Sequence, residues 1–204
     1  MYAQVRTGDI TAGDRGRIAE ILRATGVFRE PEVDVALELF DETFAASSSD
    51  VATKAPLRAG AASPHVAMRA GVASTHGTDS PFPLDGYFFL GAFTPEDELI
   101  GYACYGATPD TDRTWDLYWI AVDPSAQGTG SGTTLLSEVE RRLSGLNARM
   151  LVVETSSRSD YAPTRAFYAA RGYGEAARIR DFYAVSDDRI IFTKRFPIAP
   201  RGAE

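Results

Sequence analysis

The sequence holds very few of the residues on which disulfides and metal sites depend. Cys104 is its single cysteine, so no internal disulfide can form. The two histidines, His65 and His76, have no carboxylate or cysteine at ligand spacing, and we therefore expect no metal site. Cys104 lies in an apolar run, and we interpret it as a small core residue rather than a nucleophile.

Long apolar runs and an excess of basic charge are also missing. No run reaches the roughly 18 apolar residues of a membrane helix, and the N-terminus does not resemble a secretion signal. We therefore expect a cytoplasmic protein with no membrane partner. The 21 basic and 28 acidic residues leave a net charge of −7, which argues against a nucleic-acid partner and favours an amine-bearing substrate.

The length of 204 residues suits one domain with a sizeable core, so we expect a single domain over 1–204. Between about residue 47 and residue 83 the chain is rich in Ala, Ser, Gly and Pro and shows no sustained period. We interpret this stretch as an insertion rather than a second domain. The sequence does not distinguish a lid over a substrate site from a tolerated surface insertion.

Hydrophobic periodicity and turn residues divide the rest of the chain into strands and helices. Strands are predicted at about 3–6, 87–93, 99–106, 116–122, 150–155, 176–183 and 189–196. Helices are predicted at about 11–25, from Pro31 to about 44, from about 131 to a cap at Gly145, and at 163–171. This order predicts an α/β (α+β) fold, with a mixed sheet of about seven strands and about four helices on both faces.

The chain is organised around residues 116–133, where a buried strand leads through a glycine-rich turn into a helix. A helix that begins in this way directs free N–H groups at an anion, so the pattern indicates a phosphate or pyrophosphate site. A Walker loop is excluded because Thr133, not lysine, follows Gly132. A dinucleotide fingerprint fails at the same residue, where its third glycine would stand.

The remaining pattern, Q-x-x-G-x-G, is met by Gln127, Gly130 and Gly132. With the strand before it, it closely resembles the acyl-CoA signature of the GNAT family of N-acetyltransferases. A second block, Thr164-Arg165-Ala166-Phe167-Tyr168-Ala169-Ala170-Arg171-Gly172-Tyr173, resembles the family's A-x-x-F-Y-x-x-x-G-F helix. The resemblance covers nearly the whole chain apart from the insertion. It implies a mostly antiparallel twisted sheet whose fourth and fifth strands splay apart at a β-bulge.

The resemblance also implies a cofactor, acetyl-CoA or another short acyl-CoA, and the residues that would hold it. Backbone groups around Ile120, Ala121 and Val122 would pair with the pantetheine arm. Family members often have an asparagine at the start of the second block, and its side chain contacts the cofactor. This chain has Tyr161 at that position and departs from the family pattern there. The implied cofactor set is completed by Gln127, Gly128, Thr129, Gly130, Ser131, Gly132, Thr133 and Phe167.

An amine with a pKa of about 10.4 must lose a proton before it can attack a thioester, and the leaving thiolate needs a proton or a hydrogen bond. The resemblance places Tyr168 at the acid position, although an aromatic packing residue is the alternative. Asp116 stands at the base position of histone-acetylating members, a solvated strand end being the alternative, and Glu154 is the reserve base. The N–H of Ile120 or a neighbour would stabilise the oxyanion.

Strand alternation predicts Asp116, Tyr118, Ile120 and Val122 on one face of the sheet. Phe28, Trp115 and Tyr118 are predicted as acceptor-site walls, although aromatic residues at such positions often belong to the core. The predicted activity is direct acyl transfer to an amine of a small molecule or peptide in a ternary complex of a monomer or homodimer. The alternatives are a non-catalytic acyl-CoA-binding module and a nucleotide-dependent oxidoreductase.

Overall fold

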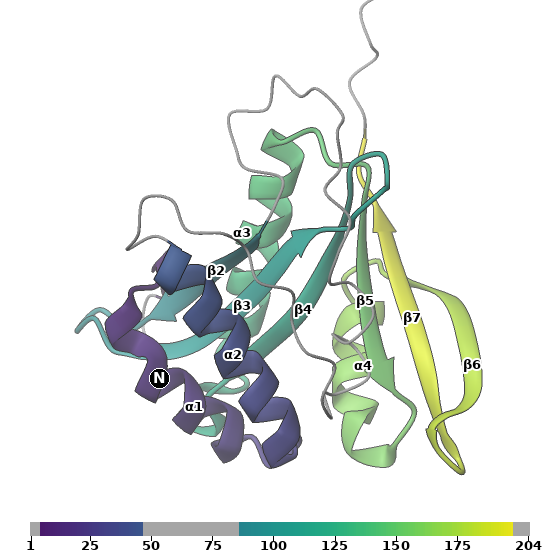
Figure 1. Cartoon of the computed structure of the whole chain (residues 1–204), viewed down its shortest axis with the longest axis horizontal. Helices are drawn as coiled ribbons and strands as arrows, with labels where there is room; N and C mark the ends of the chain where they lie inside the picture. The colour runs from purple at the N-terminus through teal and green to yellow at the C-terminus, as the bar shows by residue number, and fades with distance from the viewer. Residues whose placement is uncertain (1–4, 47–85, 198–204) are drawn as a thin grey trace, which may run out of the picture.

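A computed structural model describes residues 5–46 and 86–197 (Figure 1). Within them lies one seven-stranded sheet in the order β1-β2-β3-β4-β5-β7-β6, in which only β4 and β5 run parallel. The strands are β1 Arg6–Asp9, β2 Tyr87–Phe93, β3 Leu99–Ala107, β4 Thr114–Val122, β5 Met150–Ser156, β6 Gly174–Ala184 and β7 Asp187–Arg195.

Two hydrophobic cores lie on opposite faces of this sheet. Figure 1 shows α1 and α2 on the face toward the viewer and α3 behind the sheet. The helices are α1 Arg15–Ala24, α2 Glu30–Ala46, α3 Ser131–Gly145 and α4 Ala162–Ala169, with short 3₁₀ helices η1 Ala12–Asp14, η2 Pro124–Ala126 and η3 Ser159–Tyr161. The predicted mixed sheet with helices on both faces is confirmed.

The parallel pair β4–β5 is joined over only part of its length. Pairing runs from Thr114↔Met150 to Leu117↔Val153 and then stops, although both strands continue. Figure 1 shows the two strands diverging toward their carboxyl ends. The separation predicted between the fourth and fifth strands is therefore present.

A β-bulge lies on β4 where the separation begins. On β3, Cys104 and Tyr105 are neighbours, but they pair with Trp119 and Leu117, so Tyr118 is the extra residue. The extra residue reverses the alternation beyond it. Leu117 and Ile120 consequently both pack on the core beneath α3, whereas Tyr118 and Trp119 both pack on the core beneath α1 and α2.

The predicted common face for Asp116, Tyr118, Ile120 and Val122 is therefore wrong. Ile120 and Val122 lie on the α3 face. Asp116 follows Trp115 and precedes Leu117, both of which are on the α3 face, so its side chain is on the α1/α2 face with Tyr118. The prediction failed because it assumed a regular strand.

Other boundaries differ by small amounts. The first strand, predicted at 3–6, is Arg6–Asp9, and the helix predicted at 11–25 divides into η1 and α1. Gly145 is the last residue of α3 rather than its cap, which is Leu146. The helix predicted at 163–171 begins one residue earlier, after η3, and ends at Ala169. The proposed insertion at 47–83 lies outside the described residues, as do both histidines.

The turn that follows β4 is fixed to the N-terminal helix by a charged contact. Asp123 accepts hydrogen bonds from the N–H and Oγ of Ser125, at 2.9 and 2.6 Å, and from Arg17 Nη2 at 2.8 Å. Arg17 also donates from Nε to the carbonyl of Leu99 on β3 at 3.0 Å. The hydrogen bonds from Ser125 and then Arg17 lower the pKa of the Asp123 carboxyl below its usual value.

Replacing Asp123 by asparagine should destabilise the fold at neutral pH. Because the folded-state pKa is lowered, the ionised group stabilises the fold above its unfolded pKa of about 3.9, and this contribution is lost as the pH falls through the folded value. We expect Asp123→Asn to lower the free energy of unfolding by about 1–2 kcal/mol at pH 7 and by much less near pH 3. Urea unfolding at both pH values measures the difference.

The exposed pair between Arg15 and Asp41 provides the control, since both side chains are about half exposed. Asp41→Asn should change the free energy of unfolding by less than about 1 kcal/mol. Equal losses from the two substitutions at pH 7 would contradict the anchoring role of Asp123.

Candidate active site

The turn after β4 is held by its own side chains. Gln127 Nε2 donates to the carbonyl of Val122 at 3.1 Å, which ties the turn back to the end of the strand. Thr129 Oγ1 donates to the carbonyl of Ala126 at 2.6 Å and lies 2.8 Å from Ser131 Oγ. These contacts fix the backbone ahead of α3, while the predicted cofactor contact of Gln127 stays a prediction.

Glycine is required at two positions of this loop. Gly128 and Gly130 have φ angles of +74° and +94°, a region that side chains disfavour. Gly130 is the N-cap of α3, and it supplies no side chain to the free N–H groups of the first turn. The first backbone N–H to donate within the helix is that of Thr134, to the carbonyl of Gly130 at 2.9 Å. The N–H groups of the residues before it therefore point at whatever lies in front of the helix.

The backbone of the loop is open at two of its glycines. A Cβ built on Gly128 or Gly130 would meet no atom within 4 Å, so the backbone at both residues is open to a ligand. Gly132 instead provides close packing, since a Cβ there would lie 3.4 Å from the ring of Phe167. An open loop that leads into a helix N-terminus could receive an anion, and the pyrophosphate site stays a prediction.

Arg171 brings a positive charge to the same region, and the sequence reasoning missed it. Its guanidinium lies 3.6 Å from the ring centroid of Phe167, donates to the Phe167 carbonyl at 2.7 Å and hydrogen-bonds Thr133 Oγ1. It thereby joins the end of α4 to the first turn of α3. The signal was available, because Arg171 lies within the second sequence block.

Tyr168 lies inside the core beneath α3. Its side chain is buried, with its ring 5.5 Å from the ring of Tyr173 and 6.2 Å from that of Phe192. Burial raises the pKa of Tyr168 well above its ordinary value, so the phenol is neutral. A neutral phenol can donate a hydrogen bond, but its surroundings also fit a packing residue. The acid role stays a prediction.

The two carboxylates predicted as bases have different surroundings. Asp116 is buried and accepts a hydrogen bond from Thr108 Oγ1 at 2.5 Å. It is not the solvated strand end considered as its alternative. Glu154 lies just beyond the last β4–β5 pair and forms an ion pair with Arg189, both side chains being 17 % exposed. Glu154 is therefore committed to a partner, and the choice of base stays a prediction.

The three predicted acceptor-site walls do not share a face. Phe28 and Tyr118 both pack on the α1/α2 side, and the ring of Tyr118 meets that of Tyr87 edge-on at 5.2 Å. Trp115 is buried on the opposite face, with rings of Phe88 and Tyr105 at 5.8 and 6.3 Å. That position fits a core residue and separates Trp115 from the other two.

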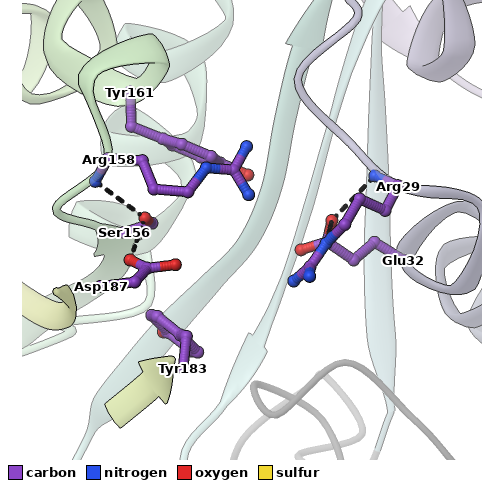
Figure 2. Close-up of a pocket in the computed structure, with 7 residues that line it drawn as sticks. All are labelled: Arg29, Glu32, Ser156, Arg158, Tyr161, Tyr183 and Asp187. Atoms are coloured by element: carbon purple, nitrogen blue, oxygen red, sulfur yellow. Dashed lines mark hydrogen bonds and ion pairs between the residues drawn. The ribbon is translucent and has the colours of Figure 1, made fainter. Parts of the chain in front are cut away.

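A small open pocket of about 240 Å³, mouth included, lies between the start of α2 and the carboxyl end of β5 (Figure 2). Figure 2 shows side chains on two facing walls, with the guanidinium groups of Arg29 and Arg158 directed into the space between them. The residues that line it are Arg29, Glu32, Ser156, Arg158, Tyr161, Tyr183 and Asp187.

The sequence reasoning named only Tyr161 of these seven residues, and for the cofactor rather than for this pocket. Arg158 lies with its guanidinium 5.3 Å from the Tyr161 ring centroid. Burial and the nearby carboxylate of Glu32 raise the pKa of Tyr161 to about 12. Tyr161 therefore carries a neutral hydroxyl at physiological pH, and its contact with a cofactor stays a prediction.

A family model described as the acetyltransferase (GNAT) family matches residues 69–173. A GNAT acetyltransferase structure from Desulfovibrio desulfuricans is 33 % identical, with a TM-score of 0.72 over 94 % of this chain and 99 % of that one. The chain belongs to the GNAT acetyltransferase family. It is thus an enzyme of the acyl-CoA-dependent acyltransferase class, as the two sequence blocks predicted. No curated protein matches the chain.

More distant GNAT structures share the fold. The PaiA N-acetyltransferase of Thermoplasma acidophilum, in complex with coenzyme A, is 16 % identical, with a TM-score of 0.59 over 95 % of this chain and 99 % of that one. The acetyltransferase YncA of Salmonella typhimurium, with acetyl-CoA, is also 16 % identical, with a TM-score of 0.61 over 98 % and 100 %. At this identity the comparison concerns the fold alone.

Two features are not found in the described parts of the chain, a metal-binding cluster and a membrane-spanning helix. No cluster of three or more histidine, cysteine, aspartate or glutamate side chains could hold a metal ion there. None of the helices there is long and apolar enough to cross a membrane. Cys104 is a buried core residue, as predicted, and burial raises the pKa of its thiol well above the usual value.

The glycine loop makes a direct prediction about acetyl-CoA binding. Acetyl-CoA should raise the melting temperature of the wild-type chain, because it binds the folded state alone. Gly130→Asp should abolish the shift, since the new carboxylate would occupy the open space at Gly130 and repel the phosphates. Thermal unfolding with and without acetyl-CoA measures both effects.

Gly26→Asp is the matched control. It makes the same change at another glycine of positive φ, +67°, just after α1, where a Cβ also meets no atom within 4 Å. We expect it to keep the shift within about one degree of wild type. A folded Gly130→Asp chain that acetyl-CoA stabilises as much as wild type would show that the pyrophosphate lies elsewhere.

Proposed function

We propose that the chain transfers an acetyl group from acetyl-CoA to the amine of a small molecule by direct attack in a ternary complex. One observation carries the proposal: the β4–β5 pairing ends at Leu117↔Val153, and beyond that point β4 leads into the open glycine loop while β5 leads into the polar pocket. The loop would hold the cofactor from the α3 side, and the acceptor would enter from the α1/α2 side. The backbone of Ile120 and Val122, unpaired with β5, would receive the pantetheine arm.

The reaction requires one proton acceptor and one hydrogen-bond donor from the protein. The ammonium group of the acceptor first loses one proton to the base. The free amine then forms a bond to the thioester carbon, the carbon–sulfur bond breaks, and the second proton lost from nitrogen passes to water while the thiolate takes up one. Asp116 would take the first proton directly or through water, because it lies on the acceptor face beside the point of separation. Tyr168 would donate to the departing sulfur, and the N–H of Ile120 would stabilise charge on the carbonyl oxygen.

A non-catalytic acyl-CoA-binding module is the second candidate. The burial of Tyr168 among Phe167, Tyr173 and Phe192 favours it, since a catalytic donor must reach the reacting sulfur. An acceptor panel that reports free CoA thiol distinguishes the two candidates. Thiol release that depends on an amine supports the transferase, and stabilisation by acetyl-CoA without any amine-dependent release supports the module.

Removing the proposed base should alter the pH profile. Asp116→Asn keeps the size of the side chain and removes its ability to accept a proton. Because free amine is scarce at low pH, kcat/KM should fall by about 10²-fold or more near pH 6.5 and by less near pH 9.5. Initial rates across this range measure the effect, with Asp112→Asn, exposed and paired with Arg113, as the control.

Glu154→Gln is measured beside these variants. An Asp116→Asn enzyme with a wild-type pH profile would exclude Asp116 as the base. A changed profile in Glu154→Gln alone would assign the role to Glu154.

Removing the hydroxyl of Tyr168 tests the donor role. Tyr168→Phe keeps the ring contacts with Tyr173 and Phe192 and deletes only the hydroxyl. If the hydroxyl acts on the sulfur, kcat should fall by about 10²-fold while the affinity for acetyl-CoA is unchanged. Single-turnover kinetics isolates the chemical step. An unchanged rate in that measurement would show that Tyr168 is a packing residue and not the donor.

A further inference from the structure

The pocket at the mouth of the β4–β5 separation contains balanced fixed charges. Arg29 and Arg158 are positive, and Glu32 and Asp187 are negative, so these four residues carry no net charge. The chain as a whole carries −7. Overall charge would attract any cation, whereas the pocket itself offers groups of both signs.

The two guanidinium groups are placed to meet an anion. They enter from opposite walls, Arg29 from the start of α2 and Arg158 from the segment after β5 (Figure 2). Arg29 is 63 % exposed and reaches Glu32 only at 3.5 Å, so its fork is open to a further partner. Arg158 is paired with Asp160 through both Nε, at 3.1 Å, and Nη2, and it is 31 % exposed. This bidentate pair orients the guanidinium, and Nη1 is the nitrogen that would meet the anion.

The wall that carries Arg158 is rigid. Arg165 Nη1 donates to the carbonyls of Ser156 and Arg158, at 2.7 and 2.8 Å. Ser156 Oγ donates to Asp187 at 2.5 Å and accepts the N–H of Arg158 at 3.0 Å. Arg158 and Asp187 therefore hold a fixed spacing, as a site for a small zwitterion requires.

We propose that the acceptor is a small amine that also carries an oxyanion group, as a free amino acid does, with the oxyanion held between Arg29 and Arg158. The inference rests on the proposed function and names the substrate class for the same site. The carboxylates of Glu32 and Asp187 hold the ammonium group until it gives a proton to the base and the free amine attacks the thioester. The neutral hydroxyl of Tyr161 is one more donor for the anion.

Two other acceptor classes fit the pocket less well. A polyamine would bring further positive charge against two guanidinium groups, which repel it. A peptide terminus has a neutral amide where a free amino acid has its carboxylate, so it leaves the two arginines without a charged partner.

The test compares acceptors that differ only in the anionic group. Each free L-amino acid is assayed beside its decarboxylated amine and its α-amide, and glycine beside aminomethylphosphonate, with CoA thiol release as the readout. We expect kcat/KM for the preferred amino acid to exceed that for its amine and its amide by at least about tenfold, the size of a charge-assisted hydrogen bond. The glycine pair shows whether the site takes a carboxylate or a phosphonate.

Substitution of the arginines completes the test. Arg29→Gln and Arg158→Gln should each raise KM for the amino acid about tenfold and leave KM for acetyl-CoA and the rate with the amine within twofold. Arg158→Lys, which keeps the charge, should recover part of the loss. Arg141→Gln is the control, since Arg141 is 71 % exposed and pairs with Glu138 on α3, away from the pocket. Stabilisation by acetyl-CoA shows that each variant is folded.

The outcomes separate the inference from the proposed function. Equal or better use of amines, amides or peptides, or an unchanged preference in both glutamine variants, overturns the acceptor class and leaves the transferase in place. Stabilisation by acetyl-CoA with no amino acid acetylated also overturns the acceptor class. A chain that neither binds acetyl-CoA nor releases thiol overturns the proposed function itself.

Discussion

One interrupted strand pair determines where this protein can work. Four residue pairs join β4 to β5, and the pairing ends at Leu117↔Val153, one residue before the bulge at Tyr118. Beyond that point the backbone of β4 pairs with β3 on one side, and no strand of residues 5–46 and 86–197 pairs with it on the other. Unpaired strand backbone is a template for an extended ligand, so the same interruption both opens the sheet and supplies the groups that would bind the pantetheine arm.

The bulge also assigns residues to the two sides of the opening. Before it, Asp116 lies toward α1 and α2. After it, Ile120 and Val122 lie toward α3, next to the glycine loop. A regular strand would have placed Ile120 and Val122 on the acceptor side with Asp116. One extra residue therefore separates the side chains that face the cofactor from those that face the acceptor.

How far the sequence could predict the site depends on how local each part is. The loop from Gln127 to Gly132 and the block around Tyr168 could be predicted, because their spacing along the chain is itself the signal. The bulge at Tyr118 could not be placed from alternation, since a single inserted residue leaves no pattern of its own. The pocket was missed because its lining residues, such as Arg29 and Asp187, are far apart in the sequence. They come together only because β7 pairs beside β5 in the folded sheet.

The same dependence on surroundings limits what Tyr168 can contribute. The thiolate that leaves is the conjugate base of a thiol whose pKa is about 8.5, whereas a free phenol has a pKa of about 10. Burial raises the pKa of Tyr168 further, so complete proton transfer from the phenol to sulfur is unfavourable. What remains favourable is a hydrogen bond to the sulfur as charge develops, with water supplying the proton after CoA departs. Tyr168 would then act as a fixed donor in an apolar setting, where such a bond is stronger than in water.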